Sequence, residues 1–190
     1  MSHKIYTTEA IVCGSRANNT SDKAFLLFTR DAGMLWATAR SVREERSRQR
    51  YALQDFSLIK VSLIRGKSGW RIGSAEGELN YFRGARSDTR EARAAIAGIV
   101  RLLRQFLHGE ISHGTLFDDT KLALEKAKEE SLQHSDLLDI FSLRLLHILG
   151  YIAVTPELEG YITAQEWWKL PSLSETASAA IEKAKQVSHL

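Results

Sequence analysis

Short apolar runs, separated by turn residues, occupy the first part of the chain. Between them stand Gly14, the polar stretch 18–22, Asp31-Ala-Gly33 and the turn 65–69. Runs of this length bounded by Gly, Asn and Asp predict β-strands joined by tight turns. Five short strands in about 80 residues favour a small barrel, with an OB-fold as the leading candidate. The expected strands are residues 7–13, 24–29, 34–39, 56–64 and 70–79.

The spacing of apolar residues changes from a strand period to a helical period near residue 83. Asp88 with Glu91 predicts the start of a first helix, and Gly109 predicts its end. Further helices are expected over 116–132 and 135–149, and Thr163 and Ser172 mark two more helix starts. The helix over 135–149 has almost no polar face, so it should lie at the buried centre of a helical domain. The pattern predicts an α+β chain, with a five-stranded OB-fold barrel over residues 1–82 and an all-helical domain over 83–190.

The composition narrows the class of protein. Of 190 residues, 44% are hydrophobic and 26% are charged, which suffices for a core without disulfides. No apolar run reaches the roughly 20 residues of a membrane-spanning helix. Residues 1–10 lack the apolar segment of a secretion signal, and Cys13 is the only cysteine. We therefore expect a cytoplasmic protein that does not contact membranes.

The sequence contains none of the familiar catalytic patterns. Gly66-Lys67-Ser68 is like the end of a phosphate-binding P-loop, but Val61 stands where that motif needs its first glycine. His108 and His113 have no neighbouring cysteine pair or His-Glu-x-x-His helix, so no metal or other cofactor is expected. A nucleophile elbow, Gly-x-Ser-x-Gly, is also absent. These absences favour a binding protein over an enzyme, and a hydrolase of unfamiliar type is the weakest alternative.

Positive charge is concentrated in the predicted barrel. Residues 1–82 hold 13 Lys and Arg against 8 Asp and Glu, whereas residues 83–190 hold 13 against 15. Residues 40–50 alone carry five arginines, and guanidinium groups bind phosphates bidentately. Trp36 and Trp70 are candidate stacking platforms for bases. The alternatives are that the arginine segment is a solvated loop and that the two tryptophans belong to the core. The candidate nucleic-acid-binding residues are Arg40, Arg43, Arg46, Arg48, Arg50, Arg65, Lys67, Arg71, Trp36 and Trp70.

A second basic stripe follows the first predicted helix. Arg90, Arg93, Arg101 and Arg104 recur at helical spacing on the side opposite its apolar face. A solvated face is the ordinary explanation. The stripe is otherwise a candidate to extend a phosphate track or to meet an acidic partner.

Several segments, in one order along residues 7–151, share a family pattern. Phe28-Thr-Arg-Asp-Ala-Gly33 is similar to an "FTRE-x-G" hairpin, and the segment 39–47 to an "AKG-x-R…S" segment. Phe141-Ser-Leu-Arg-Leu-Leu146 with Leu149-Gly-Tyr151 is similar to an "FELRLL…LGY" helix. The family with these landmarks is RecO, a family of DNA repair and recombination proteins. Smaller matches to its opening strand and later landmarks are Thr8–Val12, Leu53–Phe56 and Ala75-Glu76.

The resemblance implies a function for both predicted domains. It implies binding of single- and double-stranded DNA, strand annealing and help in loading RecA recombinase, with RecR and the acidic tail of single-strand-binding protein as partners. Arg40 and Arg43 match basic residues of the family's DNA-contacting segment, and Ser41 stands where the family usually has glycine. Many relatives carry a zinc motif of four cysteines after the "LGY" helix, and this chain has no cysteine there. The rival interpretation is an OB-fold module that binds RNA or an acidic protein.

One further expectation concerns the predicted helical domain. It carries the more acidic half of the chain together with the local arginine stripe, and Trp167 and Trp168 form an aromatic pair. These features favour a docking site for an apolar or acidic peptide, and the resemblance makes the tail of single-strand-binding protein the first candidate.

Overall fold

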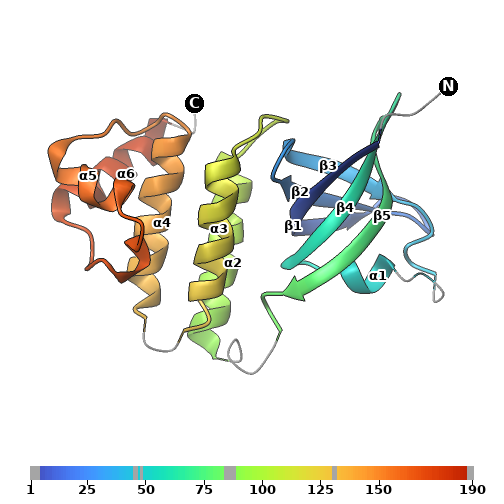
Figure 1. Cartoon of the computed structure of the whole chain (residues 1–190), viewed down its shortest axis with the longest axis horizontal. Coiled ribbons are helices and arrows are strands. Elements are labelled where there is room, and N and C mark those ends of the chain that lie inside the picture. Colours follow the sequence, from blue (N-terminus) through green and yellow to red (C-terminus); the bar gives the residue numbers. More distant parts are fainter. Residues whose placement is uncertain (1–4, 45–46, 48, 84–88, 130–131, 188–190) are drawn as a thin grey trace. The chain divides into compact units, whose positions relative to one another are not determined.

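The computed structural model describes residues 5–44, 47, 49–83, 89–129 and 132–187 (Figure 1). Its contacts divide the chain into two compact units. The barrel unit comprises Met1–Arg83 together with His108–Phe117. The helical unit comprises Gly84–Leu107 and Asp118–Leu190. A segment from the middle of the chain therefore belongs with the barrel.

The barrel unit is a closed barrel with the strand order β1-β2-β3-β5-β4. Neighbouring strands are antiparallel except β3 and β5, which run parallel and pair through Ala37–Trp70 and Thr38–Arg71. Register shifts in β1 and between β4 and β5 add the local bending that closure requires. This arrangement confirms the predicted fold class. The strands are β1 (Ile5–Ala17), β2 (Lys23–Thr29), β3 (Gly33–Ala39), β4 (Ser57–Gly66) and β5 (Gly69–Asn80).

Alternate side chains of the strands fill the barrel interior, and residues at the end of a short helix complete the core. Leu35, Ala37 and Ala39 of β3 point into the core, so the intervening Trp36 and Thr38 face outward. The helix α1 (Gln49–Ala52) follows β3, and Ala52 and Leu53 belong to the barrel core. The sequence did not indicate α1, because a single turn is too short to show a helical period.

The helical unit is built around α4 (His134–Ile148), as its continuous apolar surface predicts. Seven of its residues are buried, and α2, α5 and α6 all pack against it. None of the helices in the described parts of the chain combines the length and the apolar character needed to cross a membrane. The other elements are α2 (Arg90–Phe106), α5 (Pro156–Thr163), the 3-10 turn η2 (Trp167–Lys169) and α6 (Glu175–Val187), and α3 (Gly114–Lys126) starts in the barrel unit and continues in the helical unit.

Several helix boundaries differ from the prediction. The N-cap of α2 is Thr89, whose hydroxyl accepts from Ala92 N at 3.1 Å, while Asp88 lies outside the described residues. Thr163 is the last residue of α5 and not a helix start, and its hydroxyl donates to Glu159 O four residues earlier. The signal for the start of α5 is instead Pro156 in its first turn. The helix over 116–132 ends at Lys126, and α6 starts after Ser174, two residues past Ser172.

Candidate nucleic-acid interface

The start of the arginine-rich segment is anchored to the turn between β1 and β2. The Asp22 carboxylate accepts from Ser41 N and from Asn19 Nδ2, both at 2.9 Å. Arg43 N donates to Ser21 O at 3.2 Å, and Arg43 Nη1 donates to Asn19 O at 3.1 Å. These bonds hold the segment on the barrel, so Arg40 and Arg43 project from a supported turn.

The anchoring carboxylate is ionised at neutral pH. The hydrogen bond from the Ser41 backbone N–H, followed by that from Asn19, holds the pKa of Asp22 below its ordinary value. A carboxylate with a lowered pKa stabilises the folded state above its ordinary pKa, and this contribution is lost as the pH falls through the lowered pKa. The anchor therefore operates throughout the neutral range.

Ser41 has a backbone conformation that glycine would adopt without strain. Its φ is 50°, in the left-handed region, which costs a residue with a Cβ roughly 1–2 kcal/mol. Glycine avoids this cost but loses more chain entropy on folding. Ser41 therefore holds a turn conformation that favours glycine.

We predict that Ser41→Gly raises the free energy of unfolding by up to about 1 kcal/mol, because relief of the left-handed strain exceeds the added entropy loss. Urea denaturation measures the difference. Thr38→Gly, at an extended position of β3, is the control and should lower stability instead. A Ser41→Gly variant less stable than the parent would contradict the strain argument.

A basic groove lies between the β1–β2 turn and α1. It has a volume of about 610 Å³, and Lys23, Arg43, Arg50 and Tyr51 line it. A hollow of about 430 Å³ shares Lys23 and Arg50 with it and adds Arg83, with Asp55 as its acidic lining residue. We call the two together the α1 groove. Its four cations suit a phosphate chain.

An aromatic side chain stands at the α1 groove with its surface exposed. Tyr51 is 64% exposed, and its hydroxyl accepts from Arg50 Nη2 at 3.0 Å. The Arg50 guanidinium also lies 4.8 Å from the centre of the Tyr51 ring. A cation beside an exposed ring is the combination that single-strand binders use to hold a phosphate and stack a base.

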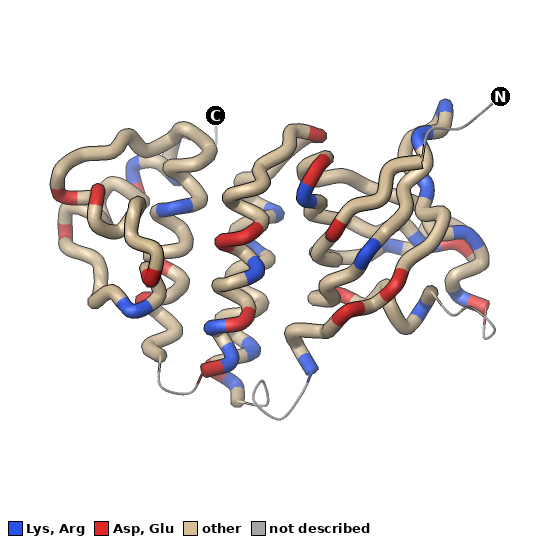
Figure 2. The backbone as a smooth tube through the Cα atoms, viewed as in Figure 1, with Lys and Arg blue, Asp and Glu red and all other residues tan. Residues whose placement is uncertain are grey.

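A second basic surface covers the outside of β3 and its neighbours. Trp36 is 38% exposed, and the Arg16 guanidinium lies 4.2 Å from its ring centre. Thr38 pairs with Arg71 across β3 and β5, and Arg71 and Arg40 line one hollow of about 240 Å³. We call Arg16, Trp36, Arg40 and Arg71 the outer patch. Positive positions thus recur on several strands and turns of the barrel (Figure 2).

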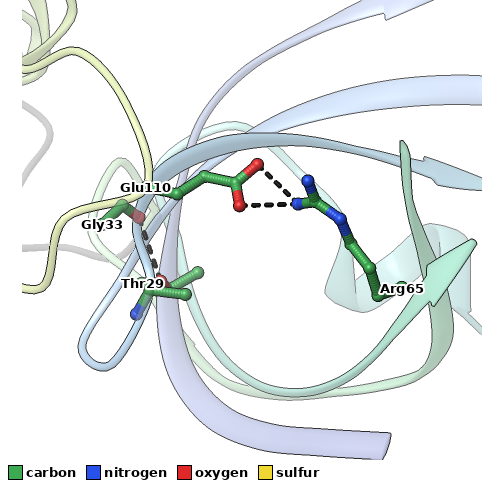
Figure 3. A network of polar contacts seen from close by, with 5 residues as sticks. Thr29, Gly33, Arg65 and Glu110 are labelled. Atoms are coloured by element: carbon green, nitrogen blue, oxygen red, sulfur yellow. Dashed lines mark hydrogen bonds and ion pairs between the residues drawn. The ribbon is translucent and has the colours of Figure 1, made fainter. Parts of the chain in front are cut away.

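The hairpin between β4 and β5 presents its cations differently. Lys67 is exposed at the turn, whereas both carboxylate oxygens of Glu110 accept from Arg65 Nη1, at 2.7 and 2.6 Å (Figure 3). Trp70 is half-buried and packs against the barrel core. Arg65 is therefore already paired with a carboxylate in this structure.

The remaining predicted residues fall outside these surfaces. Arg46 and Arg48 lie outside the described residues. On α2 the arginine stripe of the helical unit is exposed at all four positions, Arg90, Arg93, Arg101 and Arg104. Among the described residues, no three or more His, Cys, Asp or Glu side chains gather as a metal site would require.

Sequence reasoning missed four residues of the two basic surfaces. Arg16, Lys23 and Arg83 lie outside the arginine cluster of residues 40–50, so no local cluster marks them, and Tyr51 directly follows that cluster without being a cation. Strand pairing and α1 bring them to the arginines. The alternation of β3, with Leu35 and Ala37 inward, is the signal that could have placed Trp36 outside.

The fold and the site define an OB-fold protein whose barrel carries basic grooves. Residues 1–79 match the family model described as "Recombination protein O N terminal". The chain is 30% identical over 147 residues to the DNA repair protein RecO of Caldanaerobacter subterraneus, covering 77% of this chain and 59% of that protein. It is 30% identical over 158 residues to the DNA repair protein RecO of Rubrobacter xylanophilus, covering 82% and 60%. The chain is thus similar to the RecO family model over residues 1–79 and to RecO proteins over most of its length, and it spans about 60% of the length of these curated relatives.

Proposed function

We propose that this chain is a DNA repair protein that works in recombination by binding DNA through its barrel unit. The α1 groove carries the proposal, because Lys23, Arg43, Arg50 and Arg83 converge there beside the exposed Tyr51. Phosphates of either strand type meet the cations, and an unstacked base of a single strand meets the ring. The relatives' name as DNA repair proteins supports the assignment to repair.

The proposed activity is binding rather than catalysis. A protein that holds single strands by phosphate contacts and stacking leaves the Watson–Crick edges of the bases available for pairing. Strand annealing and assistance to RecA loading follow as the proposed uses of this surface. RecR is proposed as a partner on the family resemblance.

The proposed partner of the helical unit is the acidic tail of single-strand-binding protein. Trp167 is 1% exposed and its ring centre lies 6.4 Å from that of Phe141, so it belongs to the core and is not a docking residue. An apolar hollow of about 390 Å³ is the better candidate, since Tyr151, Leu158 and Val187 line it and Lys183 adds a positive charge. An apolar peptide with acidic groups complements that lining.

DNA binding measured against salt tests the proposed function. Removing two phosphate contacts with Arg43→Ala/Arg50→Ala should weaken binding to all single-stranded sequences and reduce the slope of log affinity against log salt by about 1.4. Tyr51→Ala should cost about 1–3 kcal/mol of binding with the slope unchanged, because stacking releases no counterions.

The control removes two charges away from the α1 groove. Lys60→Ala/Lys169→Ala changes two exposed lysines, neither of which lines the groove, and should keep the parent slope. If the groove variant and this control gave the same affinity and slope, the α1 groove would not be the DNA path. A parent protein that binds no DNA at low salt would overturn the proposed function itself.

A further inference from the structure

The segment His108–His113 is held tightly against the barrel. Met34 N donates to Gly109 O at 3.0 Å, and Ser112 Oγ donates to Arg30 O at 2.9 Å. The backbone approach is so close that a Cβ on Gly33 would lie 2.3 Å from Ile111 O. The position of this segment on the barrel is therefore fixed by its backbone.

This backbone position places the Glu110 carboxylate beside the Arg65 guanidinium. Glu110 accepts two hydrogen bonds from Arg65 Nη1 (Figure 3), and the two side chains are about half exposed, at 45% and 51%. The hydrogen bond from Arg65 holds the pKa of Glu110 below its ordinary value, so the carboxylate is charged at neutral pH. Glu110 thus occupies the donor group that a phosphate would use.

Aromatic rings adjoin the occupied guanidinium. Arg65 lies 4.8 Å from the centre of the Trp70 ring, and Tyr6 packs edge-on to Trp70 at 5.5 Å. Tyr6 is 40% exposed. A guanidinium beside neighbouring rings is the arrangement that binds a phosphate with its unstacked base.

We propose that Arg65, Trp70 and Tyr6 form a second subsite for single-stranded DNA, and that Glu110 occupies its phosphate position in the free protein. The inference rests on the proposed function and adds a regulation to it. In the parent protein the carboxylate keeps Arg65 from contacting a phosphate, and because an exposed ion pair is weak this restraint is modest. The segment His108–His113 then restrains binding at this end of the barrel without blocking the α1 groove.

Neutralising the carboxylate tests the inference. Glu110→Gln keeps the side-chain shape but releases Arg65, so affinity for a fluorescent single-stranded oligonucleotide should rise about three- to fivefold, as loss of an exposed ion pair allows. The slope of log affinity against log salt should also steepen by about 0.7, because one more phosphate is contacted. Thermal denaturation confirms that the variant is folded.

Two further variants separate this restraint from a general change of charge. Glu78→Gln removes an exposed carboxylate from β5 of the same unit and should leave the slope unchanged. Arg65→Ala should hardly affect the parent but should abolish the gain in the Glu110→Gln background. If Glu110→Gln binds no better than Glu78→Gln, or if its gain survives Arg65→Ala, the inference is wrong while the α1 groove result stands. Absence of DNA binding by the parent and by Glu110→Gln would overturn both proposals together.

Discussion

Replacing Arg144 by Met should lower the free energy of unfolding of the helical unit by about 3–5 kcal/mol. Arg144 of α4 donates from Nε to Asp119 of α3 at 3.0 Å, and both side chains are only 11% exposed. Its Nη1 also donates to the carbonyls of Tyr161 and Ile162 at the end of α5. The variant would leave a buried carboxylate unpaired and two carbonyls without this donor, which is the costly way to break a buried pair.

Urea denaturation followed by tryptophan fluorescence measures this effect, because Trp167 lies 5.3 Å from the Arg144 guanidinium. Lys169→Met is the matched control, since it breaks an ion pair with Glu166 whose side chains are 60% and 63% exposed. Its effect should stay within about 1 kcal/mol. Equal losses in the two variants would show that the Arg144 pair stabilises no more than a surface pair does.

The role of Arg144 is a feature that the spacing of apolar residues could not predict. The apolar pattern correctly placed α4 at the centre of the helical unit. It gave no reason for an arginine within that apolar run, because the reason is Asp119, 25 residues away on another helix. The family pattern around Phe141–Leu146 contained this residue, but a sequence pattern alone does not show what the side chain contacts.

The positions of the barrel strands were easier to predict from the sequence than the ends of those strands. Turn residues and alternation located all the strands that the structure describes. The run Thr7–Cys13 nevertheless undershoots β1, which continues to Ala17, because Ser15 and Arg16 pair with β2 without being apolar. The hydrophobic pattern indicates which residues are buried, whereas backbone pairing sets the length of a strand. A prediction from the hydrophobic pattern therefore misses polar strand ends, including those that carry binding residues.

The candidate site likewise has a part that the sequence predicted and a part that it did not. Arginines clustered in sequence were found, and Arg40, Arg43 and Arg50 do line hollows of the barrel. The state of Arg65 was not foreseeable, because its partner Glu110 is 45 residues away. A pairing between residues far apart in the sequence decides whether a cation is available to a ligand. Counting charges within a short segment cannot reveal such a pairing.

Replacing Gly33 by Ala should destabilise the barrel unit by about 2–4 kcal/mol, from left-handed strain and from collision with backbone. Gly33 has a φ of 66°, and an added Cβ would lie within 2.3–2.8 Å of Ile111 O, Ile111 N and Gly109 O. All three atoms belong to the backbone, so no side-chain rotation relieves the contact. The segment His108–His113 must move away for the variant to fold.

Gly109→Ala is the control for this prediction, because Gly109 has a φ of 85° and a Cβ there would meet nothing within 4 Å. It should show only the conformational cost of about 1–2 kcal/mol. The excess loss in Gly33→Ala, measured by urea denaturation, then reports the close approach of Gly33 and Ile111. Displacing that segment also withdraws Glu110 from Arg65, so the folded Gly33→Ala protein should bind single-stranded DNA as Glu110→Gln does. Equal destabilisation by the two alanines, with DNA affinity unchanged, would mean that the segment is not held in place by its contact at Gly33.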